Sequence, residues 1–271
     1  MMKHIFIVIS FFFLSACQSF GQLTIIADID NSLKEVSAAE FDSKRNLIWV
    51  IEDAGNSNNL IGINLEGDII HSIDVENCKN KDWEDLTQDL EGNIYIGDFG
   101  NNNKKRDSYK ILKIKEEDLD KESSKAEIIE FKLPKKEKAA DFESFFLMGK
   151  HFYLFSKDDK KVRVFKTPNV PGKHRAKLIE DYQLEGDDTK ITSAAIDKSG
   201  KTIVLLNHDK LWKLSGFKDD NFFSGTIEAM PFYHYSQKEG IGFMNKDRVI
   251  ITDERNSNEG GNIYFFDLIK N

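Results

Sequence analysis

Four kinds of short strand pattern recur in a fixed order along this chain of 271 residues, and this repeat constrains the fold more than any other feature. Apolar and polar residues alternate within each pattern, and no stretch shows a long helical period. The first pattern ends in a turn, and the second is strongly apolar and ends in acids or amides. The first is found at 37–43, 83–89, 143–148, 192–198 and 239–245, and the second at 47–53, 93–99, 152–158, 202–208 and 248–254.

The third and fourth patterns differ in number, and this difference indicates a ring. Five amphipathic third strands occur at 60–64, 109–114, 162–166, 211–215 and 263–268, but fourth strands occur only at 69–75, 127–133, 176–184 and 226–235. The segment LTIIADI at 23–29 supplies the missing one from the other end of the chain. We therefore predict an all-β fold, a five-bladed β-propeller with four strands per blade, closed by the N-terminal strand so that no sheet edge is left open within the ring.

The spacing of the repeats leaves one alternative open. Residues at the start of the first strands are 47, 59, 49 and 47 positions apart, namely Ser37, Glu84, Glu143, Thr192 and Glu239. The interval from 84 to 143 is longer by about a dozen residues, which include the charged segment KEEDLDKESSK at 115–125. A six-bladed propeller with an irregular extra blade is the alternative, although so few residues cannot supply four strands.

The first 17 residues predict export rather than a part of the fold. Lys3 precedes the apolar run from Ile5 to Phe13, which is too short to span a bilayer, and Leu-Ser-Ala-Cys follows at 14–17. The segment resembles a bacterial lipoprotein signal, in which the cysteine becomes the lipidated N-terminus. We expect a signal peptide at 1–16, lipidation of Cys17 with a palmitate-type chain, a tether at 17–22 and a single propeller domain at 23–271. Removal of Lys3 changes the net charge from −8 to −9.

The residues after Cys17 indicate the location of the protein. Gln18 replaces the aspartate that marks retention in the inner membrane, and no acidic run of the kind found in surface-exported lipoproteins follows. We therefore expect an outer-membrane lipoprotein that faces the periplasm of a Gram-negative bacterium. Cys78 is the only thiol left after lipidation, so an intramolecular disulfide is excluded.

Charge and motifs exclude several classes of function. The chain is acidic, with a pI near 5.4, and it lacks the basic stripe of a nucleic-acid binder. No G-x-S-x-G elbow, no phosphate-binding G-x-x-x-x-G-K-[ST] loop and no zinc-type histidine spacing occurs.

Carboxylates gather where the first strands begin and the second strands end, and these positions meet at one mouth of a propeller channel. Carboxylate, amide and backbone oxygens are the ligands that Ca²⁺ prefers. The candidate metal ligands are Glu239, Asp253, Asp98 and Asp53. The candidate ligand-binding residues are Glu35, Asp85, Glu143, Asp98 and Trp83. Glu84 and Glu239 are the candidates for a general acid or base, because clustering of carboxylates raises the pKa of some of them.

Each of these interpretations has a structural alternative. The Asn-, Asp- and Gly-rich segments after the second strands are also typical of ordinary turns. The carboxylates at the first strands can accept hydrogen bonds from backbone amides of neighbouring blades, and Trp83 can pack between blades. His208 follows a second strand near the same mouth, where a solvated loop histidine is the simpler interpretation.

The segment DWEDLTQDLEGNIYIGDFGNN (82–102), together with EGIGF (239–243) and ITDE (251–254), resembles a group of exported bacterial propellers. The group is similar to the SdiA-regulated and esterase-like phytase families and, more distantly, to the NHL-repeat and gluconolactonase propellers. The resemblance implies a propeller with a polar central channel and no agreed activity. Gluconolactonase-like enzymes hold calcium with a Glu, two Asn-type ligands and an Asp, and only Glu239 and Asp253 occupy comparable positions here.

Two functions follow from these expectations. The first is a lipid-anchored module that binds a protein, a glycan or a small molecule of unknown identity, with no nucleic-acid partner. The second is a hydrolase of an ester, lactone or phosphoester that depends on a divalent cation such as Ca²⁺ and uses a carboxylate at the channel mouth as general base.

Overall fold

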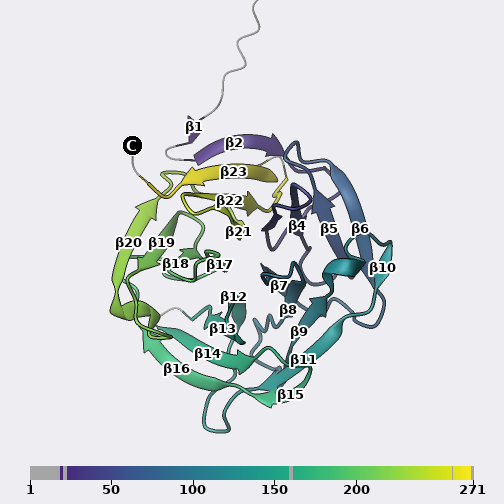
Figure 1. Ribbon diagram of the computed structural model, residues 1–271. Coiled ribbons are helices and arrows are strands. Elements are labelled where there is room, and N and C mark those ends of the chain that lie inside the picture. Colours follow the sequence, from purple (N-terminus) through teal and green to yellow (C-terminus); the bar gives the residue numbers. More distant parts are fainter. Residues whose placement is uncertain (1–18, 21–22, 159–160, 258, 270–271) are drawn as a thin grey trace, which may run out of the picture.

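Five small β-sheets stand around a central axis in the computed structural model, which describes the chain except residues 1–18, 21–22, 159–160, 258 and 270–271 (Figure 1). The protein is an all-β, five-bladed β-propeller with four strands per blade, as the repeat predicts. Cys17 and the signal segment lie outside the described residues. Within the part of the chain that is described, no helix is long and apolar enough to cross a bilayer.

Each blade contains an inner, a second, a third and an outer strand. Blades 1 to 5 are named here by their inner strands, which are β3 (Glu40–Asp42), β7 (Trp83–Gln88), β12 (Phe142–Met148), β17 (Ser193–Ile196) and β21 (Lys238–Asn245). The second strands are β4 (Leu47–Val50), β8 (Ile94–Asp98), β13 (His151–Ser156), β18 (Thr202–Leu206) and β22 (Arg248–Asp253). The third strands are β5 (Asn59–Ile63), β9 (Tyr109–Ile114), β14 (Val162–Pro168), β19 (Lys210–Ser215) and β23 (Asn262–Asp267). The outer strands are β6 (Ile69–Val75), β11 (Glu127–Lys132), β16 (Lys177–Tyr182), β20 (Thr226–Pro231) and β2 (Leu23–Asp28).

The ring closes in blade 5, where the first described long strand pairs with the last. β2 runs antiparallel to β23, with Leu23 opposite Phe266 and Ile25 opposite Tyr264 (Figure 1). A two-residue strand, β1 (Ser19–Phe20), continues this sheet outward. The prediction that the N-terminal strand completes the last blade is therefore confirmed.

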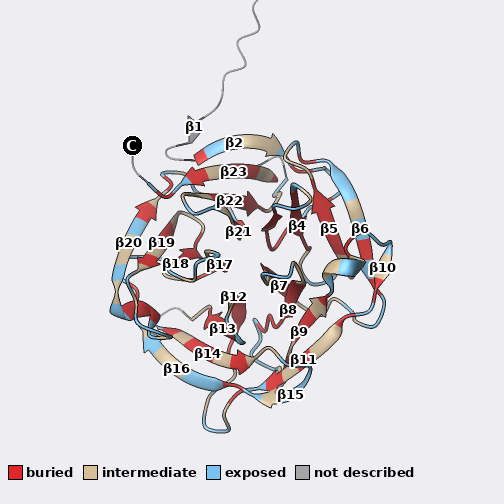
Figure 2. Cartoon of the chain, viewed as in Figure 1, coloured by how far each residue is buried: buried red, intermediate tan, exposed pale blue. Residues whose placement is uncertain are grey.

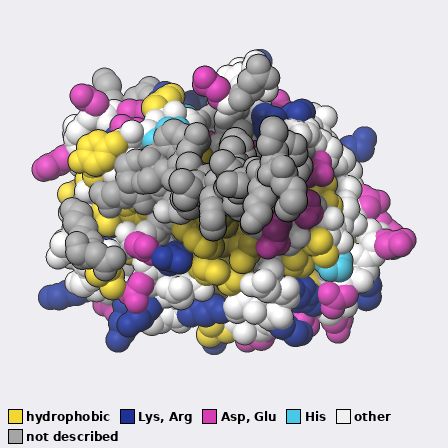
Figure 3. Space-filling model, turned by 90° about the horizontal axis from the view of Figure 1, so that it is seen from above, with side chains coloured by type: hydrophobic (Ala, Val, Ile, Leu, Met, Phe, Trp, Pro, Cys, Tyr) yellow, Lys and Arg dark blue, Asp and Glu magenta, His cyan; other side chains and the backbone are white. Residues whose placement is uncertain are grey.

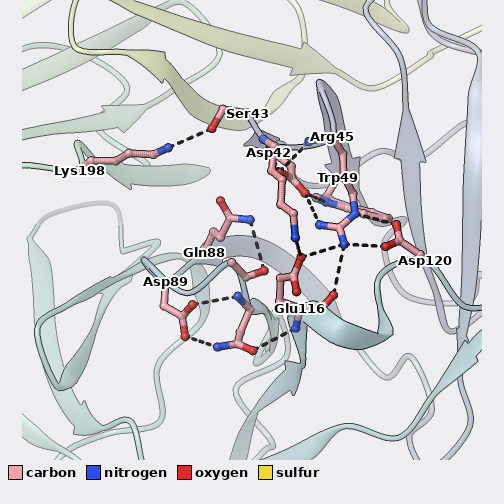
Figure 4. Close-up of polar contacts among 12 residues, drawn as sticks. Asp42, Ser43, Arg45, Trp49, Gln88, Asp89, Glu116, Asp120 and Lys198 are labelled. Carbon is pink, nitrogen blue, oxygen red and sulfur yellow. Dashed lines mark hydrogen bonds and ion pairs between the residues drawn. The ribbon is translucent and has the colours of Figure 1, made fainter.

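The additional residues of the second repeat form a brace to blade 1 rather than a blade. They contain a 3-10 helix, η1 (Glu116–Asp118), and β10 (Ser123–Ser124), which pairs in parallel with β6 of blade 1. Arg45 of blade 1 bonds Glu116 and Asp120 of the same segment (Figure 4). The six-bladed alternative is thus wrong.

Blade 3 makes a similar brace, because β15 (Gly172–Arg175) pairs in parallel with β11 of blade 2. A second 3-10 helix, η2 (Phe222–Ser224), precedes β20.

The hydrophobic core is divided among the interfaces between blades. Five clusters of buried side chains are found, and each combines residues of two neighbouring blades; Trp49 of blade 1 and Trp83 of blade 2, for example, share one cluster. Inner and second strands are largely buried, whereas most residues of the outer strands are half-buried or exposed (Figure 2). Figure 3 views the rim on the side of β2, where hydrophobic surface is bordered by charged side chains of both signs. Because a blade buries its faces only against its neighbours, the sequence must repeat its strand pattern five times.

Candidate functional site

Three glutamates stand at equivalent positions at the end of the channel where the inner strands begin, which we call the upper mouth. Glu84, Glu143 and Glu239 are each the additional residue of a β-bulge, since the register shifts between Trp83 and Asp85 and at the same place in the other two strands. A bulge bends the strand and redirects its side chain, and bulges are common beside active sites.

The two remaining blades have hydroxyl residues at these positions. Ser37 Oγ donates to the carbonyl of Trp83 at 3.0 Å, and Thr192 Oγ1 donates to the carbonyl of Lys238 at 2.7 Å. These two side chains link neighbouring blades. The glutamates are therefore the inner-strand carboxylates that face the upper mouth from blades 2, 3 and 5.

Carboxylates of blades 1 and 2 converge at this mouth. One oxygen each of Asp53, Asp82 and Glu84 lies within 4.8 Å of the others. Asp53 follows β4, Asp82 directly precedes β7 and Glu84 lies in β7. The loop after β8 passes so close that a Cβ on Gly100 would fall 2.0 Å from Glu84 Oε1, which explains the glycine. Three carboxylates gathered in this way offer oxygen ligands to a hard divalent cation, and their chemistry fits one.

The proximity of these carboxylates changes their acidity. Burial, followed by the charges of Glu143 and Asp53, raises the pKa of Glu84 well above its usual range. Burial and the charge of Asp53 raise the pKa of Asp82 to about 6, and burial also raises the pKa of Asp53. Across the mouth, burial and the charges of Glu239 and Asp53 raise the pKa of Glu254 to about 8. Crowded carboxylates with raised pKa values are what a cation would stabilise in their charged form.

Lys157 partly neutralises the mouth from blade 3. It follows β13 and forms an ion pair with Glu143. Burial alone would lower the pKa of Lys157, but the charges of Glu143 and Glu239 raise it. Lys157 therefore remains charged at neutral pH and holds Glu143 in place.

Glu239 contacts a histidine. His208 Nε2 lies 3.1 Å from Glu239 Oε1, and His208 Nδ1 lies 3.3 Å from the hydroxyl of Tyr235. The side chain of His208 is 21% exposed, so it is half-buried rather than a freely solvated loop residue. A histidine oriented by a carboxylate is a common arrangement for a general base.

A buried lysine fixes the backbone around His208. Lys238 is fully buried, and its ammonium group donates to the carbonyls of His208 and His234 at 3.0 and 3.2 Å and to Ser236 Oγ at 2.8 Å. Burial lowers the pKa of Lys238 to about 8. Lys238 thus positions the two segments that carry His208 and Tyr235.

Asp85 is fully buried among the inner strands and joins blades 2, 3 and 4. Its carboxylate accepts hydrogen bonds from the amides of Leu86, Phe145 and Ala194 at 3.0, 3.0 and 3.2 Å and from Ser193 Oγ at 2.8 Å. Ser193 Oγ in turn accepts from the amide of Ile241. Burial raises the pKa of Asp85, whereas these donors lower it. Asp85 therefore accepts hydrogen bonds from neighbouring blades, which is the structural alternative to the ligand-binding role that the sequence suggested for it.

Other sequence candidates have partners of their own. Asp98 pairs with Arg106 at 3.0 Å, and Asp253 accepts from the Asn262 amide and the Tyr264 hydroxyl, both at 2.7 Å. Neither belongs to the cluster of Asp53, Asp82 and Glu84. Glu35 is exposed and accepts from Asn56 Nδ2 at 2.6 Å. Trp83 is fully buried between blades, so a ligand at the mouth would not contact it.

Three residues of the site are not among the candidates from the sequence, namely Asp82, Asp141 and Lys157. Asp82 and Asp141 nevertheless precede Glu84 and Glu143 in the same Asp-x-Glu pattern. Asp141 is buried, and its Oδ1 accepts from the amide of Asn101 at 2.7 Å. The repeated pattern in neighbouring blades was a signal that could have identified both aspartates.

We expect the free energy of unfolding, measured without divalent cations, to fall by at least about 1 kcal/mol from pH 5 to pH 8. The raised pKa values mean that the folded state keeps protons that the unfolded state releases, so stability decreases as pH rises through the pKa of Asp82, about 6, and of Glu254, about 8. Urea unfolding at several pH values measures this slope. Glu254→Gln should reduce it and Glu259→Gln, at an exposed position, should not; a stability that rises over this range would contradict the expectation.

Together these features define a five-bladed propeller with a crowded carboxylate site at one mouth of its channel. No protein-family profile and no curated protein matches the sequence. Among solved structures, the chain is similar to a gluconolactonase from Xanthomonas campestris, with a TM-score of 0.53 and 9% identity over 91% of this chain and 89% of the other. It is also similar to the PQQ-bound aldose sugar dehydrogenase of Streptomyces coelicolor, with a TM-score of 0.51 and 8% identity over 93% and 99% of the two chains.

Identities this low establish a shared fold and no more. They agree with the resemblance to gluconolactonase-type propellers at the level of architecture. The likeness to the SdiA-regulated and esterase-like phytase families remains an expectation from the sequence.

Proposed function

We propose that this propeller is a divalent-cation-dependent hydrolase of a small ester, lactone or phosphoester, and that it acts at the upper mouth. The observation that carries the proposal is that one oxygen each of Asp53, Asp82 and Glu84 lies within 4.8 Å of the others, at the mouth that also holds the pair formed by His208 and Glu239. Burial, followed by the charges of Glu35 and Glu239, raises the pKa of Asp53, so Asp53 and Glu239 belong to one electrostatic site.

The chain supplies binding and proton transfer in this proposal. When bound, the cation supplies a Lewis acid that polarises the carbonyl or phosphoryl oxygen of the substrate. Asp53, Asp82 and Glu84 would hold it. With the proton on Nε2 directed to Glu239, His208 Nδ1 is the basic nitrogen; it would take the proton of the attacking water by exchanging its contact with the Tyr235 hydroxyl for that water.

A cavity next to His208 offers room for a substrate. It has a volume of about 600 Å³ and is lined by His208, Tyr235, Glu254, Asn262 and Tyr264, among others. The two similar solved structures are a gluconolactonase and a sugar dehydrogenase, so a common fold supports different chemistries. The fold alone therefore does not determine the reaction, and the proposal rests on the cavity and the carboxylates of this chain.

We expect hydrolysis of at least one compound in a panel of lactones, aryl esters and phosphoesters, and we expect a chelator to abolish it. His208→Ala should lower kcat by about 10²–10⁴-fold, because the general base is lost. His174→Ala, in the brace strand β15, is the matched control and should have no effect. Hydrolysis that continues at full rate in the presence of chelator would refute the proposal.

Binding without turnover is the second candidate function. Tyr233 and Tyr235 are 79% and 70% exposed, and Tyr235 lines the cavity beside His208. Exposed aromatic surface at the rim of a polar cavity favours recognition of a protein, glycan or small ligand. Binding of a ligand while Asp53, Asp82 and Glu84 hold a divalent cation, without any hydrolysis, would favour this candidate.

We further propose that Cys17 is lipidated and anchors the propeller to the outer membrane on its periplasmic side. The support is the signal sequence, together with the position of β1 and β2 at the outer edge of blade 5 (Figure 1). Cys17→Ala should release the protein from the membrane fraction, and a metabolic label for fatty acids should be lost. Unchanged membrane association of Cys17→Ala would contradict the anchor.

A further inference from the structure

A basic surface lies on the outer wall of the ring, where blade 2 meets blade 3. Three cavities of about 300, 510 and 510 Å³ adjoin one another there, and Arg175 lines all three. The chain as a whole has a net charge of −8, so this concentration of positive charge is local. We call the surface the basic rim and define it by Lys132, Lys135, Lys136, Arg175 and Lys177.

The acids that line these cavities already have cationic partners, at 3.0, 2.7 and 4.0 Å. The pairs are Asp107 with Lys132, Asp220 with Lys166 and Glu137 with Arg163. Within the described part of the chain, no ion pair is formed by the other four cations, which are Lys135, Lys136, Arg175 and Lys177. The basic rim therefore has an excess of positive charge that no side chain of the protein compensates.

The brace strand β15 brings these cations together. It pairs in parallel with β11, with Arg175 opposite Lys132, and the chain continues through Ala176 into β16, where Lys177 is the first residue. The Arg175 guanidinium is held in place because Nη1 donates to the carbonyl of Leu133 at 2.7 Å. A segment outside the strand repeat thus places two cations of blade 3 beside those of blade 2. Like charges gathered in this way repel one another, and an anionic partner relieves the repulsion.

The positive charge also acts inside the cavity on the side of blade 3. His151 lines this cavity together with Lys166, Lys177 and Asp220. Burial, followed by the charge of Lys166, lowers the pKa of His151; Asp220 opposes this effect and Lys177 adds to it. The two lysines outweigh the one acid at this position, so the cavity favours an anion.

Two kinds of anionic partner fit this surface poorly. An extended peptide commonly binds by adding a strand to a free sheet edge, but β15 already occupies the edge of β11 over Ile129–Lys132. The end of β16 is contacted by η2, whose Phe223 stacks on Tyr182 with 4.3 Å between the ring centroids. A membrane is the other partner, and β15 and β16 lie on the opposite side of the ring from β1 and β2 (Figure 1). A protein anchored at Cys17, as proposed above, would therefore present the basic rim away from its own membrane.

We propose that the basic rim binds an anionic polysaccharide, whose acidic groups pair with Lys135, Lys136, Arg175 and Lys177. Cations spread over three adjoining cavities suit a polymer with negative charges at regular intervals, because several weak contacts on one chain then act together. Pro134 and Leu178 supply apolar surface between the cations, against which the carbon faces of sugar rings pack. This binding does not depend on the carboxylates of the upper mouth or on His208.

The test uses polygalacturonate fragments as the probe and dextran of the same size as the uncharged polymer, with binding measured by calorimetry. We expect binding of polygalacturonate alone, with an affinity that falls by about tenfold or more between roughly 50 and 200 mM salt, because surface charges are screened. Equal binding of dextran, or no binding of polygalacturonate, would overturn the proposal. Tighter binding of poly-L-glutamate, of anionic phospholipid vesicles or of single-stranded DNA would also overturn it, because the partner would then be a protein, a membrane or a nucleic acid.

Charge-removing variants locate the binding surface. Lys177→Gln and the double variant Lys135→Gln/Lys136→Gln should each lower the affinity for polygalacturonate by about fivefold or more, the contribution of about one surface cation. Lys246→Gln removes the same charge from an exposed site of blade 5 and should have no effect. Lys177→Arg keeps the charge and should keep the affinity. Full affinity in both Gln variants would refute the assignment. Hydrolysis at the upper mouth should be unaffected by Lys177→Gln, so failure of one proposal leaves the other standing.

Discussion

Replacement of Asp85 by alanine is expected to destabilise the propeller by about 3–5 kcal/mol, the largest effect of any single substitution considered for this chain. Asp85 is fully buried, and four donors from strands β7, β12 and β17 converge on its two oxygens. Alanine would leave the amides of Phe145 and Ala194 without an acceptor at the axis, where buried unpaired donors are costly. Urea unfolding measures the loss directly.

Two further variants keep this prediction testable if Asp85→Ala does not fold. Ser193→Ala removes one donor to Asp85 and the acceptor of the Ile241 amide, and it should cost about 1–2 kcal/mol. Asp187→Ala, at an exposed site, should change stability by less than about 0.5 kcal/mol. A loss below about 1 kcal/mol for Asp85→Ala would show that the axis does not depend on this carboxylate.

Glu84→Gln is expected to have two effects of opposite sign. It should lower the affinity for Ca²⁺ or Mg²⁺ by about a hundredfold or more, equivalent to about 3 kcal/mol, because one of three convergent carboxylates is lost. Without cations it should stabilise the fold by about 0.5–2 kcal/mol, since repulsion with Glu143, Asp53 and Asp82 is relieved. Thermal unfolding with and without cation separates the two effects.

The matched control for Glu84→Gln is Asp253→Asn. Asp253 is a calcium candidate from the sequence, but its oxygens already accept from Asn262 and Tyr264. Cation affinity should therefore stay within about twofold of the parent value in Asp253→Asn. If Asp253→Asn abolished the cation-induced rise in melting temperature while Glu84→Gln preserved it, the cluster would be assigned to the wrong residues.

The strands could be predicted because each blade buries both faces against its neighbours, which requires the same pattern of apolar residues in every blade. The outer strand at 69–75 is observed as β6 with the same bounds, and the segment 23–29 closes the ring as β2 over Leu23–Asp28. The braces β10 and β15 could not be predicted, because each is a short parallel pairing with a different blade and leaves no period in the sequence.

Part of the site could also be predicted, because spacing alone places Glu84, Glu143 and Glu239 at equivalent positions. Spacing does not reveal which carboxylates are already engaged. Asp85 and Glu84 are neighbours in sequence, yet one accepts from three inner strands while the other faces the mouth, and only the register of the bulge separates them. The contact of His208 with Glu239 joins two blades and has no local signal.

The closing strand has a consequence for the order of folding. Leu23 of β2 pairs with Phe266 of β23, roughly 240 positions later, so the first strand of the four-stranded blades to be synthesised has the last described strand as its partner. At about 5–20 residues per second, β2 leaves the ribosome roughly 10–50 s before that partner exists. Ring closure is also the most non-local contact of the chain and is expected to be slow. During this delay β2 is an unpaired edge, and this is the interval in which a chaperone would be needed most.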